Sequence, residues 1–217
     1  MSIRREKTIW MFGVGVGLLT VTLFAGQSTR PQAGGAMPMG DMQSDAMMMT
    51  MTPAQKIANA TSAGPTTVSA KATVMDWPAR EGAAPTTLRA GTNGWTCLPD
   101  MPQSKGNDPM CVDKTWMIWV EAYLAHKTPD LRTVGIGYMT AAGGGWGSNT
   151  DPYAMKEMTD NHWGHHGPHI MILVPDLKSL SGVSTDPSNG GPYVMFAGTP
   201  YAHIMAPTVE SGMMMSK

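Results

Sequence analysis

Short apolar segments separated by glycine and proline turns limit the fold of this chain more than any other feature. Strand-like segments lie at 132–139, 169–174, 193–197 and 201–206, and Gly198-Thr199-Pro200 predicts that the last two pair through a turn. With 25 Gly and 17 Pro in 217 residues, a long helical bundle or a coiled coil is not expected. The strands do not alternate regularly with helices, as they would in a βαβ fold. The pattern predicts an α+β fold, a single compact domain over 65–209 with a mainly antiparallel sheet.

One segment has the pattern of a main amphipathic helix. Asp108 and Pro109 form a helix start, because Asp caps free N–H groups and Pro fits the first turn. Pro129 disfavours helical backbone at the residue before it, so the helix is expected over about 109–127. Its core-facing stripe is Val112, Trp116, Trp119, Val120, Tyr123 and Leu124. Gly135 and Gly137 share one face of the next strand and would let the helix approach it closely.

Weaker signals predict elements before this helix. Thr52 and Pro53 precede a short helix over 53–61. Residues 66–75 alternate between apolar and polar side chains, which predicts a half-buried strand. Asn93-Gly94 predicts a hairpin between 86–91 and 95–98.

Two further segments follow the strand at 132–139. The glycine-rich run Gly143–Thr150 has the composition of a flexible loop. Asp151-Pro152 predicts a short helix that ends near Thr159.

The N-terminus has the pattern of an export signal. Arg4, Arg5 and Lys7 precede an uncharged apolar run over 8–26. Cleavage after Ala25 would release the protein to the periplasm or the medium, whereas an uncleaved segment is long enough to tether it to the inner membrane. We therefore expect a signal or membrane anchor at 1–26, a Met-rich flexible linker at 27–64 and a Met-rich tail at 210–217. The net charge of −1 gives no basic face for nucleic acid.

Two cysteines agree with an oxidising compartment. Cys97 and Cys111 are the only cysteines of the chain, and an even count in an exported protein predicts a disulfide. The disulfide would stabilise the folded state by about 3 kcal/mol, because it lowers the chain entropy of the unfolded state. The alternative is a pair of thiolate ligands to a metal.

Histidines gather in one short segment. His162, His165, His166 and His169 lie within eight residues that also contain Gly164, Gly167 and Pro168. Imidazole is a common metal ligand, and such a loop can bring several rings to one point. The spacing fits no zinc motif, so the alternative is a polar surface loop with locally hydrogen-bonded histidines.

Two similar tripeptides lie in predicted strands. His169-Ile170-Met171 and His203-Ile204-Met205 each place a His and a Met on one strand face. If the strands are neighbours, two imidazoles and two thioethers could meet, and that ligand set suits copper. The alternative is that this face packs beneath the helix, with Met filling space.

Methionine is also concentrated in segments that should not form a core. Met37, Met39, Met42, Met47–Met49 and Met51 lie in the linker, and Met213–Met215 lie in the tail. Closely spaced thioethers can hold Cu(I). A biased linker without function and a sacrificial target of oxidation are the alternatives.

Several segments together resemble a group of uncharacterised exported bacterial proteins. They are Gly94–Asp100 (GWTCLPD), Asn107–Cys111 (NDPMC), Val134–Met139 (VGIGYM), Ser148–Pro152 (SNTDP), Pro168–Met171 (PHIM) and Gly198–Met205 (GTPYAHIM). The resemblance covers about half the chain and implies a location in the cell envelope. It assigns no residue a role.

Three functions remain open. The leading hypothesis is a copper-binding envelope protein, with His169, His203, Met171 and Met205 as the core site and His165 and His166 as accessory ligands. The second is a structural or interaction module without metal, whose contacts are Trp146 and Trp163 in exposed loops; its protein partner is not identified. The third is an enzyme that uses the histidine loop, for which Ser148, Asp151 and His169 form a triad on paper. Common enzyme motifs are absent, so an enzyme is the least expected.

Overall fold

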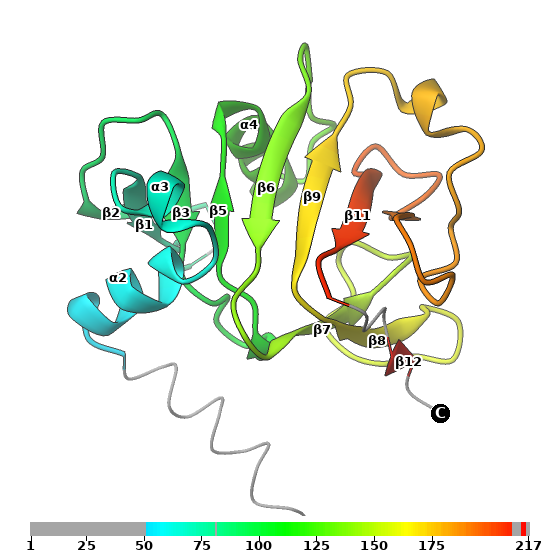
Figure 1. Cartoon of the computed structure of the whole chain (residues 1–217), viewed down its shortest axis with the longest axis horizontal. Coiled ribbons are helices and arrows are strands. Elements are labelled where there is room, and N and C mark those ends of the chain that lie inside the picture. Colours follow the sequence, from blue (N-terminus) through cyan, green and yellow to red (C-terminus); the bar gives the residue numbers. More distant parts are fainter. Residues whose placement is uncertain (1–50, 81, 210–213, 216–217) are drawn as a thin grey trace, which may run out of the picture. The chain divides into compact units, whose positions relative to one another are not determined.

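The computed structural model describes residues 51–80, 82–209 and 214–215, which lie within one compact unit, Pro38–Lys217. Its largest feature is an eight-stranded sheet with the order β10-β11-β9-β6-β5-β3-β1-β2 (Figure 1). Only β1 and β3 pair in parallel among these described strands. The strands are β1 Thr73–Asp76, β2 Thr86–Arg89, β3 Thr96–Leu98, β5 Met110–Val112, β6 Gly135–Met139, β9 His169–Leu173, β10 Tyr193–Met195 and β11 His203–Pro207. The predicted α+β fold with a mainly antiparallel sheet is confirmed.

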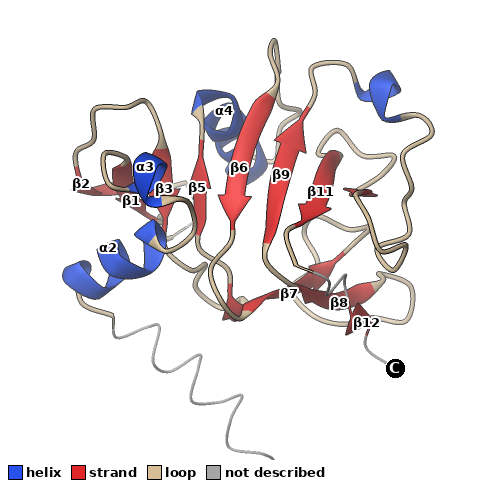
Figure 2. Ribbon diagram, in the orientation of Figure 1, coloured by secondary structure: helices blue, strands red, loops and turns tan. Residues whose placement is uncertain are grey.

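A smaller sheet lies at one end of the large one (Figure 2). Its order is β12-β8-β7-β4, with β4 Lys105–Asn107, β7 Gly144–Ser148, β8 Trp163–His166 and β12 Met214–Met215. The helices of the described chain are α2 Pro53–Thr61, α3 Thr66–Ser69, α4 Lys114–Leu124 and the 3-10 turn η1 Leu177–Leu180.

Helix α4 begins later than its sequence pattern suggests. Asp113 caps it by accepting a hydrogen bond from the Trp116 N–H, and its second oxygen accepts one from the N–H of Ile136. Asp108 and Pro109 instead precede β5, because Cys111 and Val112 pair with strands on both sides. Val112 therefore joins the core from a strand and not from the helix.

The two strand glycines allow α4 to approach β6, as predicted. A Cβ on Gly135 would lie 3.0 Å from the Cβ of Thr115. A Cβ on Gly137 would lie 2.9 Å from the Cε of Met171 and 3.3 Å from the indole nitrogen of Trp116. A side chain at Gly135 would push the helix away from the sheet, and one at Gly137 would also require Met171 to move.

Helix α2 lies on the face of the sheet opposite to α4 (Figure 1). The disulfide belongs to the same small core as the buried residue Ala60 of this helix. Thr52 caps α2 through a capping box with Gln55, and the predicted helix over 53–61 is confirmed. Ala60 is fully buried beside Cys111, although this helix lies within the segment expected to be a linker. Cys97 and Cys111 are direct partners on β3 and β5 and form the predicted disulfide.

Two predictions near β1 are corrected. The strand predicted over 66–75 exists only from Thr73 onward, as β1. Residues 66–69 form α3 rather than a strand, because Pro65 starts a helical turn whose end is held by Arg89, which donates to the carbonyl of Ser69. The strands β2 and β3 do not form a hairpin, since β1 lies between them and pairs with both. The Asn93-Gly94 turn exists, with Gly94 at φ 78°, but it connects strands that are not neighbours.

Two further predictions are wrong around the second sheet. The expected flexible loop at 143–150 contains β7, and the expected histidine loop contains β8, which pairs with it. The segment after Asp151 contains turns and no helix up to Thr159. Met214 and Met215 of the expected tail form β12 beside β8.

The predicted export signal lies outside the described residues, as do Met37–Met49 of the Met-rich segment and Met213. Among the residues that the structure describes, no helix is both long and apolar enough to cross a membrane.

Candidate functional site

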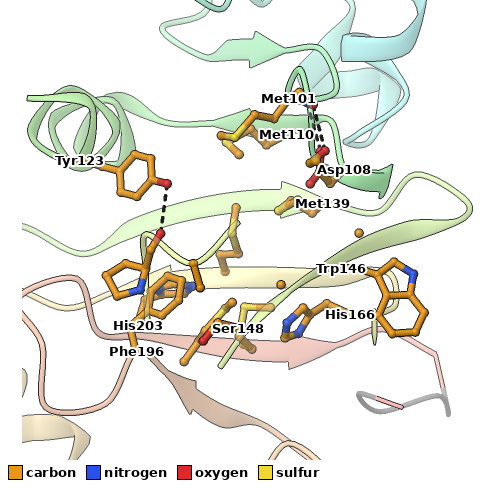
Figure 3. A pocket seen from close by; sticks show the side chains of 18 of the residues that line it. Met101, Asp108, Met110, Tyr123, Met139, Trp146, Ser148, His166, Phe196 and His203 are labelled. Carbon is orange, nitrogen blue, oxygen red and sulfur yellow. Dashed lines mark hydrogen bonds between the residues drawn. The ribbon is translucent and has the colours of Figure 1, made fainter. Parts of the chain in front are cut away.

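A cavity of about 190 Å³ lies between α4, the main sheet and the second sheet (Figure 3). Aromatic rings from α4 form one wall, and Trp119 stacks on Tyr123 with ring centroids 5.3 Å apart. Three of its lining residues are the histidines His166, His169 and His203. Seven more are methionines: Met101, Met110, Met139, Met155, Met171, Met195 and Met205. The cavity therefore combines thioether and imidazole groups inside an apolar shell.

The two His-Ile-Met tripeptides lie on neighbouring strands. β9 and β11 pair antiparallel, and Met171 is the direct partner of Met205. The His and Met of each tripeptide are buried and line the cavity, whereas Ile170 and Ile204 are half-buried on the other face. The alternation of strand side chains thus brings His169, Met171, His203 and Met205 to one face, beneath α4.

Backbone carbonyls fix the ring orientation of two histidines. His169 Nδ1 lies 2.6 Å from the carbonyl oxygen of Gly167, and His203 Nδ1 lies 3.0 Å from that of Tyr201. A carbonyl can only accept, so Nδ1 carries the proton in both rings. The neutral rings then keep a lone pair on Nε2, and this is the arrangement in which histidines bind metals. His169 Nε2 is buried and has no hydrogen-bond partner.

His166 reaches the cavity from the second sheet. Its Nδ1 lies 2.9 Å from the hydroxyl of Tyr193, and its Nε2 is buried without a partner. The ring centroids of His166 and His169 are 6.5 Å apart. Because a metal–nitrogen bond is about 2.0–2.1 Å long, one ion reaches both rings at this separation only if its two bonds to nitrogen are nearly opposite each other or if the rings move closer together.

All three buried histidines are held neutral. Burial, followed by the charge of His169, lowers the pKa of His166 to about 3. Burial lowers the pKa of His169 and of His203 to about 4. The rings therefore keep their nitrogen lone pairs well below neutral pH.

Met195 was not among the residues expected from the sequence. It is the cross-strand partner of His203, and its Cε lies 3.9 Å from the point that a Cβ on Gly147 would occupy. His166 Nε2 lies 3.8 Å from the same point. The predicted pairing of 193–197 with 201–206 could have identified Met195, because the register of a hairpin determines which side chains share a face.

His165 does not join the cavity. It lies next to His166 on β8 but points to the opposite side, where its Nε2 donates to the carbonyl oxygen of Gly143 at 2.6 Å. Its ring lies against Trp146, which carries the Lys105 ammonium 4.5 Å above its own ring. His162 is exposed. Of the four clustered histidines, only His166 and His169 face the cavity.

The tryptophans expected in exposed loops lie in strands. Trp146 is on β7 and Trp163 on β8, and both are half-buried. Both border the cavity, although strand pairing places their side chains on the same face of the second sheet as His165. The expectation that these two rings lie in exposed loops is therefore wrong.

The triad drawn from the sequence does not form. The Ser148 hydroxyl donates to the carbonyl oxygen of Asn161 and accepts hydrogen bonds from the N–H groups of Thr150 and Asp151. The Asp151 carboxylate accepts from the N–H of Tyr153. Since these bonds hold turns, neither side chain is positioned to activate the other.

A pair of carboxyl groups lies beside the cavity. Asp108 lines it and accepts hydrogen bonds from the N–H of Met101 and the hydroxyl of Ser104. Asp100 is buried, its Oδ1 accepts from the N–H of Asp108 at 2.6 Å, and its Oδ2 has no partner. Burial, and then Asp108, raises the pKa of Asp100 far above its usual range. The Asp100 carboxyl therefore keeps its proton near neutral pH.

Ligand counting limits which ion the site could hold. Within the described residues, no three His, Cys, Asp or Glu side chains are arranged to hold a metal ion. No protein-family model matches this chain, and neither a curated protein nor a solved structure is significantly similar to it.

Proposed function

We propose that the protein binds Cu(I) in the cavity between α4 and the two sheets. His166 and His169 supply Nε2 ligands, and one or two thioethers from Met171, Met195 and Met205 complete the coordination. Among metals of biological supply, Cu(I) is the one that accepts mixed imidazole and thioether ligands most readily. The observation that carries the proposal is the pair of buried Nε2 atoms without partners in a methionine-lined cavity.

Electrostatics favour a single positive charge in this place. A buried cation needs a compensating charge nearby. Asp108 lines the same cavity, and its charge acts on His169. A monovalent ion with neutral ligands is balanced by one negative charge nearby, and the Asp100–Asp108 pair supplies that charge.

The same proposal includes a location outside the cytoplasm. A disulfide persists in an oxidising compartment, and the basic and apolar pattern of residues 1–26 suits export. His203, whose Nδ1–H donates to a carbonyl, stands as an additional ligand on β11.

The test is a Cu(I) titration of the full chain under anaerobic conditions, in competition with bicinchoninate. The first variant is His169→Asn, because the Asn amide can still donate to the carbonyl of Gly167 while the Nε2 ligand is lost. The matched control is His162→Asn, an exposed histidine at φ 47°, where Asn is well tolerated. All three proteins keep the Met-rich segment, so its binding is common to them.

We expect one tight Cu(I) equivalent in the wild type and in His162→Asn. His169→Asn should weaken this equivalent by at least about tenfold. Equal binding in all three proteins would contradict the cavity site and would move copper binding to the Met-rich segment. The far-UV circular dichroism spectrum of each variant shows whether it is folded.

A further inference from the structure

The methionines of the cavity differ in how far they are exposed. Met171, Met195 and Met205 are at most 9% exposed. Met155 lines the same cavity, yet 58% of it is exposed, since it lies on the segment between β7 and β8. Met155 is thus a methionine that borders the cavity and is also exposed to solvent.

The segment that carries Met155 is anchored at its start. The Tyr153 hydroxyl donates to the Tyr201 hydroxyl at 2.6 Å, and its ring stacks on Tyr123 with centroids 5.0 Å apart. These contacts hold the backbone two residues before Met155 against the aromatic wall of the cavity. The position of Met155 at the mouth is therefore a property of the fold.

The buried sites cannot accept copper directly from a bulky donor. His166, His169 and the inner thioethers are all buried, so a Cu(I) carrier in solution does not reach them. A ligand at the opening of the cavity, accessible from solvent, removes this difficulty because Cu(I) can exchange its ligands one bond at a time.

We propose that Met155 is the relay ligand through which Cu(I) passes between an external Cu(I) complex and the cavity, an inference that rests on the proposed function. One bond from copper to the donor breaks as a bond to the Met155 sulfur forms. The Met155 bond then breaks as bonds to the inner ligands form. Copper remains Cu(I) throughout, and no proton or electron is transferred.

The chain contains a matched control on the same segment. Met158 is 56% exposed, almost the same as Met155, but it does not line the cavity. Met155→Leu and Met158→Leu each replace an exposed thioether by a hydrocarbon of similar volume, so both variants should fold as the wild type does.

The experiment follows Cu(I) transfer from its bicinchoninate complex to the metal-free full chain by stopped-flow absorbance, with the equilibrium affinity measured alongside. We expect Met155→Leu to slow transfer by about tenfold or more while the affinity changes by less than about twofold. Met158→Leu should match the wild type in both measurements.

Three results would overturn the relay. Unchanged transfer in Met155→Leu would show that copper does not need this sulfur. An affinity loss as large as the loss of rate would make Met155 a resident ligand rather than a relay. Failure of the wild type to bind Cu(I) in a way that depends on His169 would refute the cavity site itself, together with the relay.

Discussion

The two ends of the main sheet, one covered by α2 and the other by α4, have cores of different composition. Beneath α2, at β1, β3 and β5, the core consists of small side chains such as Ala60 and the Cys97–Cys111 disulfide, all fully buried. Beneath α4, at β6, β9 and β11, the core contains neutral histidines and buried nitrogens without partners.

The difference between the ends indicates a division of roles. A buried polar atom without a partner costs free energy. Two of the four such atoms found in the described residues belong to His166 and His169 of the cavity, and a third belongs to the carboxyl of Asp100, a residue whose backbone N–H donates to Asn59 of α2. We interpret the α2 end as the stabilising part of the domain and the α4 end as the part that retains unsatisfied groups for a ligand.

The largest expected effect is on the pH dependence of the α4 end. Burial lowers the pKa of His166 to about 3 and that of His169 and His203 to about 4. The unfolded chain binds protons on these groups near pH 6.5, so it holds more protons than the folded chain between pH 6.5 and about 4. Stability is therefore lost as the pH falls through this window, at up to about 1.4 kcal/mol per pH unit for each histidine.

Urea unfolding of the metal-free protein at several pH values between 7 and 5 measures this slope. His169→Asn should remove about one third of it. A free energy of unfolding that is flat between pH 6.5 and 5 would show that these rings are not held neutral, and the contrast between the two ends would disappear.

The next effect concerns the α2 end. Replacing both Cys97 and Cys111 by Ala removes the covalent link between β3 and β5. We expect a loss of about 3 kcal/mol in the free energy of unfolding, from the entropy of the opened loop. Cu(I) affinity at 25 °C should stay within about threefold of the wild type while the variant remains folded. A large loss of affinity in folded protein would mean that the two ends are coupled.

A third, smaller effect comes from Asp100. Its folded pKa is raised, so the folded chain keeps a proton that the unfolded chain releases near pH 3.8, and stability decreases as the pH rises above that value. Asp100→Asn cannot ionise, yet it still accepts from the Asp108 N–H. The variant should exceed the wild type in stability at pH 8 by about 1–3 kcal/mol and approach it at pH 5. Thermal unfolding of both proteins at pH 5 and pH 8 measures this difference in stability. If the difference between the variant and the wild type is the same at both pH values, the raised pKa of Asp100 is refuted.

The sequence predicted those parts that depend on local patterns. Alternation along the strand placed His169 with Met171 and His203 with Met205, and Gly135 and Gly137 predicted the close approach of a helix. Both predictions depend only on the alternating direction of side chains along one strand, which is the same in a flat and in a twisted sheet.

Features that depend on distant pairing could not be predicted in this way. Gly144–Ser148 has loop composition and becomes β7 only because β4 and β8 flank it. For the same reason, the sequence predicts only an accessory role for His166, because this residue lies in a second sheet that the glycine-rich composition of 143–150 does not indicate. Asn93-Gly94 predicted a turn correctly, but no local signal revealed that β1 would lie between the strands on either side.

The smallest effect separates two neighbours on one strand. His165 and His166 are adjacent on β8, but strand alternation sends His165 to the outer side, where it donates to Gly143. His165→Ala should therefore cost no more than about 1 kcal/mol, the worth of one partly exposed hydrogen bond. The Cu(I) affinity of this variant should equal that of the wild type, whereas His166→Ala should weaken binding by at least about tenfold. A loss of Cu(I) affinity in His165→Ala as large as that in His166→Ala would contradict the assignment of His166 to the cavity face. A larger loss in His165→Ala would indicate a one-residue shift in the β7–β8 register, which would exchange the positions of the two rings.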